Sequence, residues 1–266
     1  MGIQHSREEK LAAFGRLLDV MDRLRSECPW DREQTTESLR TNTIEEVYEL
    51  SDAILSGAPE EIKKELGDVL LHVVFYSKIG EEQGSFDVAD VANALCDKLI
   101  FRHPHVYGET EASTSEAVIE RWEELKQKEK NGNKTVLSGV PSSLPALIKA
   151  YRIQDKARGV GFDWQHPEDV WSKVEEELSE LRGAITSGSV EDTEVEFGDF
   201  LFSIINVARK YKVNPDNALE RTNTKFIRRF GYIEARAKEE GRTLKELSLE
   251  EMDALWDEAK KLEAKP

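Results

Sequence analysis

Four carboxylate side chains in the second half of the chain have the types and spacing of a metal site: Glu177, Glu180, Glu196 and Asp199. Residues three apart share a face of a helix, so Glu177 pairs with Glu180, and Glu196 pairs with Asp199. If the two helices form a hairpin, the pairs converge. Clustered like charges destabilise a fold unless a counter-charge neutralises them, and a hard divalent cation with oxygen ligands does so. The spacing therefore predicts a Mg²⁺ site, with Mn²⁺ as an alternative ion.

The first half repeats this quartet as Glu46, Glu49, Glu65 and Asp68. In both copies the third carboxylate follows the first by 19 positions. A single E-x-x-E in so acidic a chain is more often a solvated surface, but two quartets of equal spacing favour metal binding. Helical di-iron sites also use four carboxylates and add a histidine in E-x-x-H, which neither copy has. Mg²⁺ or Mn²⁺ is therefore favoured over iron or zinc.

A small anion such as a nucleotide would also need positive groups opposite the metal, and the second half contains several. Lys225 and Arg229 are four residues apart, so they face one direction and can clamp phosphate oxygens. The full set that could contact a nucleotide is Lys173, Asn223, Lys225, Arg228, Arg229 and Trp256. The alternative for the basic residues is a helix surface that balances acidic neighbours, and for Trp256 it is a core aromatic. In the first copy Cys96 and Phe101 replace Asn223 and Arg228, so its phosphate clamp is reduced.

The elements that carry these residues are predicted to be helices. Apolar residues recur at helical spacing almost throughout, and no stretch alternates as a strand would, which predicts an all-α fold. The two carboxylate segments align without a gap at an offset of 131, which indicates a duplicated domain. The Gly-, Ser- and Pro-containing segment between them predicts domains at 1–130 and 146–266, with a linker at 131–145.

Each copy contains a short Ser-Gly turn, at Ser56-Gly57 and Ser187-Gly188, which predicts two antiparallel helices. One helical hairpin cannot bury its own apolar stripe. Each copy must therefore find partner helices in itself, in the other copy or in a second chain.

The net charge of −16 excludes some classes of partner. A chain this acidic repels nucleic-acid polymers and anionic membrane surfaces. Two cysteines without a C-x-x-C pattern indicate reduced thiols, and the charged N-terminus does not resemble a secretory signal. No run approaches the roughly 18 apolar residues of a membrane helix. We therefore expect a cytoplasmic protein.

The chain resembles the MazG family of nucleoside triphosphate pyrophosphohydrolases. The resemblance rests on CPWDREQT, on EEVYEL…KKELGDVLLH and its repeat EEELSEL…VEFGDFLFS, and on KLIFRHPHVYG and KFIRRF. RWEELK, at 121–126, also resembles LWDEAK in the second copy. The family implies two tandem all-α domains, with four-helix-bundle cores completed in a homodimer. It also implies Mg²⁺-dependent hydrolysis of (deoxy)nucleoside triphosphates to the monophosphate and pyrophosphate, with broad base preference.

The resemblance places catalysis in the C-terminal domain. It assigns metal ligation to Glu177, Glu180, Glu196 and Asp199, and nucleotide contacts to Lys173, to Lys225 through Arg229 and to Trp256. We expect water to attack the α-phosphorus, with Glu176 as the general base. The alternative is a non-catalytic helical scaffold that senses nucleotides or binds another protein.

Overall fold

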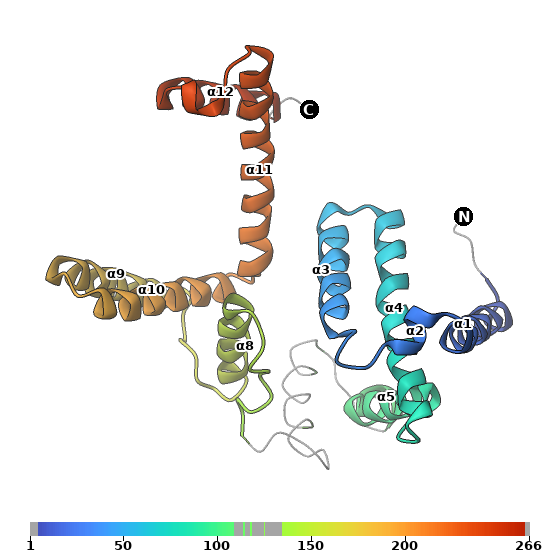
Figure 1. Ribbon diagram of the computed structural model, residues 1–266. Helices are drawn as coiled ribbons and strands as arrows, with labels where there is room; N and C mark the ends of the chain where they lie inside the picture. The colour runs from blue at the N-terminus through green and yellow to red at the C-terminus, as the bar shows by residue number, and fades with distance from the viewer. Residues whose placement is uncertain (1–4, 109–113, 115–117, 119–124, 126–134, 264–266) are drawn as a thin grey trace. The chain divides into compact units, whose positions relative to one another are not determined.

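The computed structural model describes residues 5–108, 114, 118, 125 and 135–263. Every regular element in these residues is a helix, which confirms the all-α prediction (Figure 1). Contacts divide the chain into two compact units, Met1–Leu125 and Lys126–Pro266. The predicted bounds at 130, 131–145 and 146 stay predictions. Most of 121–126 and the start of the predicted linker, 131–134, lie outside the described residues.

The N-terminal unit is built around a long helical hairpin. Its helices are α1 (Arg7–Glu27), α2 (Pro29–Glu33), α3 (Arg40–Ser56), α4 (Pro59–Glu82), α5 (Val88–Arg102) and α6 (Pro104–Tyr107). Helices α3 and α4 pack along each other, and α1 packs on α4. The core lies at this junction, where Met21, Leu39, Val74, Phe75 and Ile79 are buried together.

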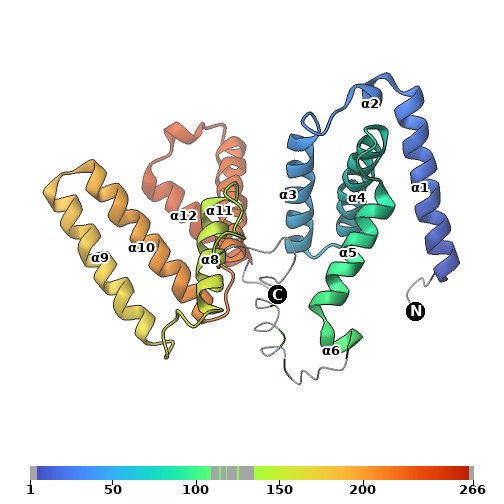
Figure 2. The same cartoon turned by 90° about the horizontal axis from the view of Figure 1, so that it is seen from below.

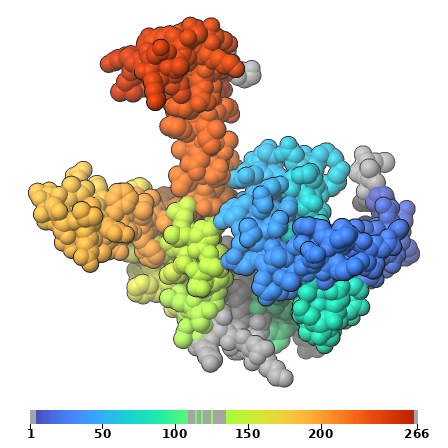
Figure 3. All heavy atoms as spheres, viewed as in Figure 1, coloured from blue at the N-terminus to red at the C-terminus, as the bar shows by residue number. Residues whose placement is uncertain are grey.

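The C-terminal unit repeats the hairpin and adds a projecting arm. Its helices are α8 (Ala146–Arg158), α9 (Asp169–Ser187), α10 (Val190–Lys210), α11 (Pro215–Glu239) and α12 (Leu249–Glu263), with a short 3-10 turn at Leu244–Glu246. Figure 2 shows α9 and α10 side by side, and α8 packs against α10. In Figure 3, α11 stands as a column one helix wide between this hairpin and α12.

Local sequence explains where the hairpin helices end and begin. Gly57 and Gly188 follow α3 and α9 with φ of 72° and 79°, a left-handed conformation that glycine adopts without a Cβ clash. Pro59 occupies the first turn of α4, and Ser189 caps α10 by accepting a hydrogen bond from the Asp192 backbone N–H. The predicted Ser-Gly turns are therefore the hairpin turns.

The apolar stripes of the hairpins are only partly covered. On α4, Leu66, Leu70 and Val73 are 39–52% exposed, and on α10, Leu201 is 47% exposed. Each hairpin thus carries an apolar face that its own unit leaves open to solvent.

The helical glycines beside these stripes do not serve close packing inside one chain. A Cβ added at Gly67 or Gly198 would meet no atom within 4 Å. Among the described residues, no other helix therefore approaches these glycines closely. Within that part of the chain, no helix has the length and apolar character needed to cross a membrane.

Candidate functional site

Three carboxylates of the C-terminal unit converge where α9 faces α10. Glu177 comes from α9, and Glu196 and Asp199 come from α10; one oxygen of each lies within 4.8 Å of the others. Glu177 is buried, Glu196 is half-buried and Asp199 is exposed, so the cluster runs from the interior of the hairpin to its surface. A group of oxygens this close, open on one side, suits a divalent cation.

The cluster keeps a high density of negative charge. Burial raises the pKa of Glu196, and the carboxylates of Glu180 and Asp199 raise it further. Glu180 lies outside the group of three converging oxygens, but its charge acts on Glu196 more strongly than that of any other neighbouring carboxylate. All four predicted ligands are therefore brought to one place, with three of them in position to share an ion.

Lys173 forms an ion pair with this cluster. Its Nζ lies 2.7 Å from Glu177 Oε1 and 2.9 Å from Glu176 Oε1, and these two contacts raise the pKa of the lysine. Lys173 thus supplies part of the counter-charge that the carboxylates need. Glu176, the predicted general base, is exposed and paired with the same lysine.

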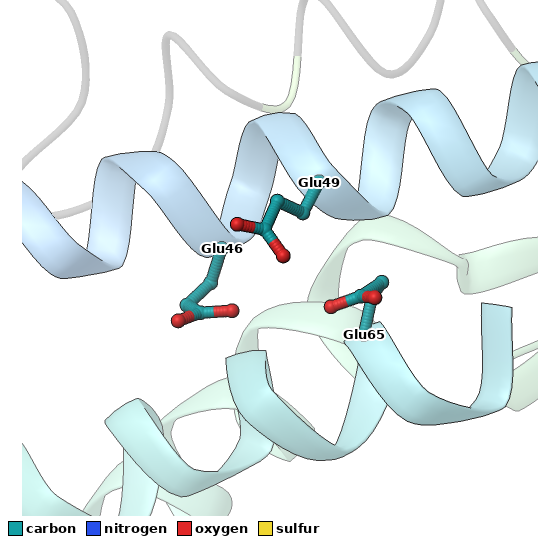
Figure 4. A group of neighbouring side chains, drawn as sticks. All are labelled: Glu46, Glu49 and Glu65. Atoms are coloured by element: carbon teal, nitrogen blue, oxygen red, sulfur yellow. The ribbon is translucent and has the colours of Figure 1, made fainter. Parts of the chain in front are cut away.

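The N-terminal unit builds a matching group from Glu46, Glu49 and Glu65 (Figure 4). Burial raises the pKa of Glu46, and the charge of Asp68 raises it further, so the fourth predicted ligand is also close. Glu65 is buried; its Oε1 lies 2.9 Å from Lys64 Nζ, while its Oε2 has no hydrogen-bond partner among the described residues. A buried carboxylate oxygen without a partner is costly, and a cation would satisfy it.

The predicted phosphate clamp lies on a different part of the C-terminal unit. Lys225, Arg228 and Arg229 are on α11, where Glu263 of α12 pairs with both arginines at 2.7 and 2.8 Å. Asn223 donates a hydrogen bond to Glu220 at 3.1 Å. The arm carries these residues away from the α9–α10 hairpin (Figure 1). Within one chain, the described residues do not bring this set opposite the carboxylates.

Trp256 lies in the small core of the arm. Its ring is 5.1 Å from Phe226 and 5.4 Å from the Arg229 guanidinium, and it packs on the buried residues Ile233, Ala237 and Leu247. Of the two alternatives for this tryptophan, the observed packing is that of a core aromatic.

A cavity beside the C-terminal carboxylates was not predicted from the sequence. It has a volume of about 370 Å³ and reaches Lys173, Glu177 and Asp199. Its wall includes Gln154 of α8, Asn206 of α10, and Phe162 and Trp164 of the segment between α8 and α9. The signal available in the sequence was the GFDW segment, whose tryptophan matches that of CPWD in the first copy.

Comparisons with known proteins match both copies of the repeat. A family model described as the MazG nucleotide pyrophosphohydrolase domain matches residues 34–107 and again residues 165–232. The nucleoside triphosphate pyrophosphohydrolase/pyrophosphatase MazG of Thermotoga maritima is 44% identical over 93% of this chain and 95% of its own length. The nucleoside triphosphate pyrophosphohydrolase of Escherichia coli K12 is 39% identical over 93% of this chain and 97% of its own. An uncharacterised Bacillus subtilis protein, YabN, is 44% identical over 97% of this chain and 54% of its own.

Proposed function

Because the chain belongs to the MazG family of nucleotide pyrophosphohydrolases, we propose that it hydrolyses nucleoside triphosphates to the nucleoside monophosphate and pyrophosphate. The observation that carries this proposal is the convergence of Glu177, Glu196 and Asp199 beside a cavity large enough for part of a nucleotide. The relatives named as nucleoside triphosphate pyrophosphohydrolases cover nearly the whole chain, so the same reaction is the first one to test.

The donor set fits a divalent cation, and Mg²⁺ is the ion we propose. All the ligands are carboxylate oxygens, and histidine and cysteine are absent from both three-residue groups. Burial raises the pKa of Glu196 and the neighbouring carboxylates raise it further, so a bound cation would offset both the burial and the repulsion. Glu177, Glu180, Glu196 and Asp199 would hold the ion. When bound, such an ion holds phosphate oxygens, activates a water molecule and neutralises charge on the leaving group.

The side chains of the chain itself would bind and orient the triphosphate. Lys173 forms an ion pair with Glu177, and a phosphate oxygen of the substrate would be a second anionic partner for it. Water adds its oxygen to the α-phosphorus while the bond from that phosphorus to the α–β bridging oxygen breaks. Pyrophosphate leaves with the bonding electron pair. The proton of the attacking water passes to a carboxylate, for which Glu176 remains our proposal.

We also propose that the working molecule is a homodimer. The exposed apolar stripes on α4 and α10 would be buried by a partner, and Gly67 and Gly198 leave room for a helix of that partner to approach closely. A second copy would complete the four-helix bundles. It would also offer a route for Lys225, Arg228 and Arg229 to reach a carboxylate cluster that lies on the other chain.

The decisive experiment is product analysis. The protein is incubated with ATP or dTTP and Mg²⁺, and the products are resolved by chromatography. The proposal requires the monophosphate and pyrophosphate; inorganic phosphate with the diphosphate, or no turnover, would refute it. An absence of turnover would favour the alternative of a nucleotide-sensing or protein-binding scaffold.

Paired variants then locate turnover in one of the two units. We expect Glu180→Gln to abolish nearly all activity and Glu49→Gln to have a small effect. The reason is that the N-terminal unit has the carboxylates but a reduced set of basic residues, with Cys96 and Phe101 at the positions of Asn223 and Arg228. Equal losses in the two variants would contradict the assignment of catalysis to the C-terminal unit.

A further inference from the structure

One carboxylate at the end of α12 is shared by two arginines of α11. Glu263 is the last residue of α12. Its Oε1 accepts a hydrogen bond from Arg228 Nε at 2.8 Å, and Arg228 Nη2 lies 2.7 Å from the same oxygen. Its Oε2 accepts hydrogen bonds from Arg229 Nε at 3.0 Å and from Arg229 Nη2 at 2.8 Å. Each oxygen therefore orients one guanidinium group, and the single carboxylate fixes both.

This ion pair is not what holds α12 against α11. The two helices share an apolar core, in which Leu255 of α12 packs against a buried cluster that includes Ile233 and Ala237 of α11. The Arg228 side chain is 63% exposed, and an exposed ion pair contributes little to stability. The pairing of two arginines with Glu263 therefore has a better explanation in binding than in folding.

Both arginines keep N–H donors for a further anion. A guanidinium donates from its Nε and from both of its Nη groups. Glu263 engages only the edge formed by Nε and Nη2, and no described residue pairs with the Nη1 group of either Arg228 or Arg229. Arg228 also lines an open groove of about 420 Å³ beside the ion pair. Two positive charges outweigh one negative charge, so the group can still attract an anion.

Glu263 has two opposing effects on a phosphate bound by these arginines. Its negative charge repels the phosphate, but salt screens exposed charges over about 8 Å at physiological ionic strength. Its hydrogen bonds also hold the two long side chains in one orientation, which lowers the entropy that they would lose on binding a ligand. Salt does not screen this second effect. At physiological salt we therefore expect the ordering of the arginines to outweigh the repulsion.

We propose that Glu263 is a positioning residue for the hydrolysis, and that it holds Arg228 and Arg229 in the orientation that binds the phosphates of the substrate. This inference rests on the proposed function, in which these arginines contact the triphosphate. Trp256 of the same helix adds a second restraint, because its ring lies 5.4 Å from the Arg229 guanidinium. Through Glu263, α12 would therefore act on the site by orienting groups of α11.

Steady-state kinetics with ATP and Mg²⁺ at 0.15 M salt tests this role. Glu263→Gln removes the charge that both arginines share and keeps the size of the side chain. We expect it to raise KM about 5- to 10-fold, the effect of leaving one or two long side chains to be ordered by the substrate. The kcat should change less than about twofold, because the arginines contact the phosphates before the reaction begins. Glu263→Asp keeps a carboxylate and should recover part of the lost affinity.

A double-mutant cycle shows whether Glu263 acts through the arginines. Isothermal titration in Mg²⁺ measures binding of adenosine 5′-(α,β-imido)triphosphate, which resists cleavage. Glu263→Gln should weaken this binding about 5- to 10-fold in the parent protein. In the variant that carries Arg228→Ala and Arg229→Ala, it should change the binding less than about twofold, because the side chains that Glu263 orients are gone.

Asp257→Asn is the matched control. Asp257 is an exposed carboxylate on the same helix, so the substitution removes one negative charge without touching the ion pair. It should keep the KM, the kcat and the binding of the imido nucleotide at the values of the parent protein. Thermal unfolding should give Glu263→Gln and Asp257→Asn Tm values within about 3 °C of the parent, because exposed charges contribute little to stability.

The possible failures differ from one another. If the parent protein neither cleaves ATP nor binds the imido nucleotide, the proposed function fails and this inference fails with it. In an active parent protein, an unchanged KM in Glu263→Gln would show that the carboxylate positions nothing. A lower KM would show that Glu263 competes with phosphate for the arginines, and a fall in kcat alone would place it in the chemical step. An equal loss of binding with and without the arginines would show that Glu263 acts elsewhere; each of these results overturns the inference.

Discussion

Replacing Glu177 with glutamine removes one converging carboxylate while keeping the size of the side chain. Glu177 is 6% exposed, so the change acts at the buried end of the cluster. In the parent protein, Mg²⁺ at 100 times its dissociation constant stabilises the folded state by about 2.7 kcal/mol. The C-terminal unit has about 140 residues. Its unfolding entropy is then about 0.3 kcal/mol/K, which converts that energy to a rise in Tm of about 9 °C.

The variant should lose most of this rise. Mutation of a residue that merely orients a metal ligand weakens metal binding 10- to 100-fold, so loss of a ligand itself should cost at least about 100-fold. The same Mg²⁺ concentration then stabilises the variant by about 0.4 kcal/mol, a rise in Tm of about 1 °C. Lys173 keeps its contact with Glu176, so the metal-free variant should still fold.

Calorimetry with and without Mg²⁺ measures these shifts, using EDTA for the metal-free state. Glu175→Gln is the matched control, because Glu175 is an exposed carboxylate on the same helix and outside the converging group. It should keep the full Mg²⁺ response. An undiminished response in Glu177→Gln would show that the cation does not bind at this cluster, and an equal loss in both variants would show a non-specific charge effect.

Three further predictions concern stability and assembly. Asp163→Asn should cost about 3 kcal/mol at neutral pH by urea unfolding, because it breaks a pair with the buried Arg209. Burial raises the pKa of Asp163, but hydrogen bonds from Arg209 and Lys210 outweigh the effect of burial and lower the pKa below the ordinary 3.8. As the pH falls below about 3.8, the parent protein should therefore lose the stability that this ion pair contributes. A destabilisation by Asp163→Asn that does not change with pH would contradict the ion-pair explanation. Gly188→Ala should destabilise the C-terminal unit by about 1 kcal/mol, because the φ of Gly188 is +79°. Gly183→Ala within α9 should instead stabilise the unit by a similar amount. If both variants changed the stability in the same direction, the positive φ of Gly188 would not explain the turn. Leu201→Glu should convert the proposed dimer to monomers in light scattering after gel filtration, and a dimer that persists would place the interface elsewhere.

Much of the architecture was readable from local patterns. Helical spacing of apolar residues and the two Ser-Gly turns predicted the hairpins, because a glycine that must adopt positive φ ends a helix at a fixed point. The spacing of Glu177, Glu196 and Asp199 predicted their convergence, because two helices joined by a short turn pack antiparallel.

The basic residues show where local patterns stop being informative. Their spacing correctly places Lys225, Arg228 and Arg229 on one helix, but it carries no information on where that helix points. In the structure Glu263, which lies more than 30 residues away along the chain, pairs with both arginines. The cavity was missed for the same reason, because Gln154, Phe162 and Asn206 come from three separate segments with no shared periodicity.

The sequence by itself determined the helices, their turns, the duplication and the two carboxylate clusters, since each follows from contacts between neighbours along the chain or across one short turn. Only the tertiary structure decided what surrounds each cluster. Packing of α8 and of the Phe162–Trp164 segment on α10 leaves a cavity beside Glu177, while Phe75 of α4 is buried in the core of the N-terminal unit. The difference depends on side chains from distant segments meeting in space, which chain spacing does not specify.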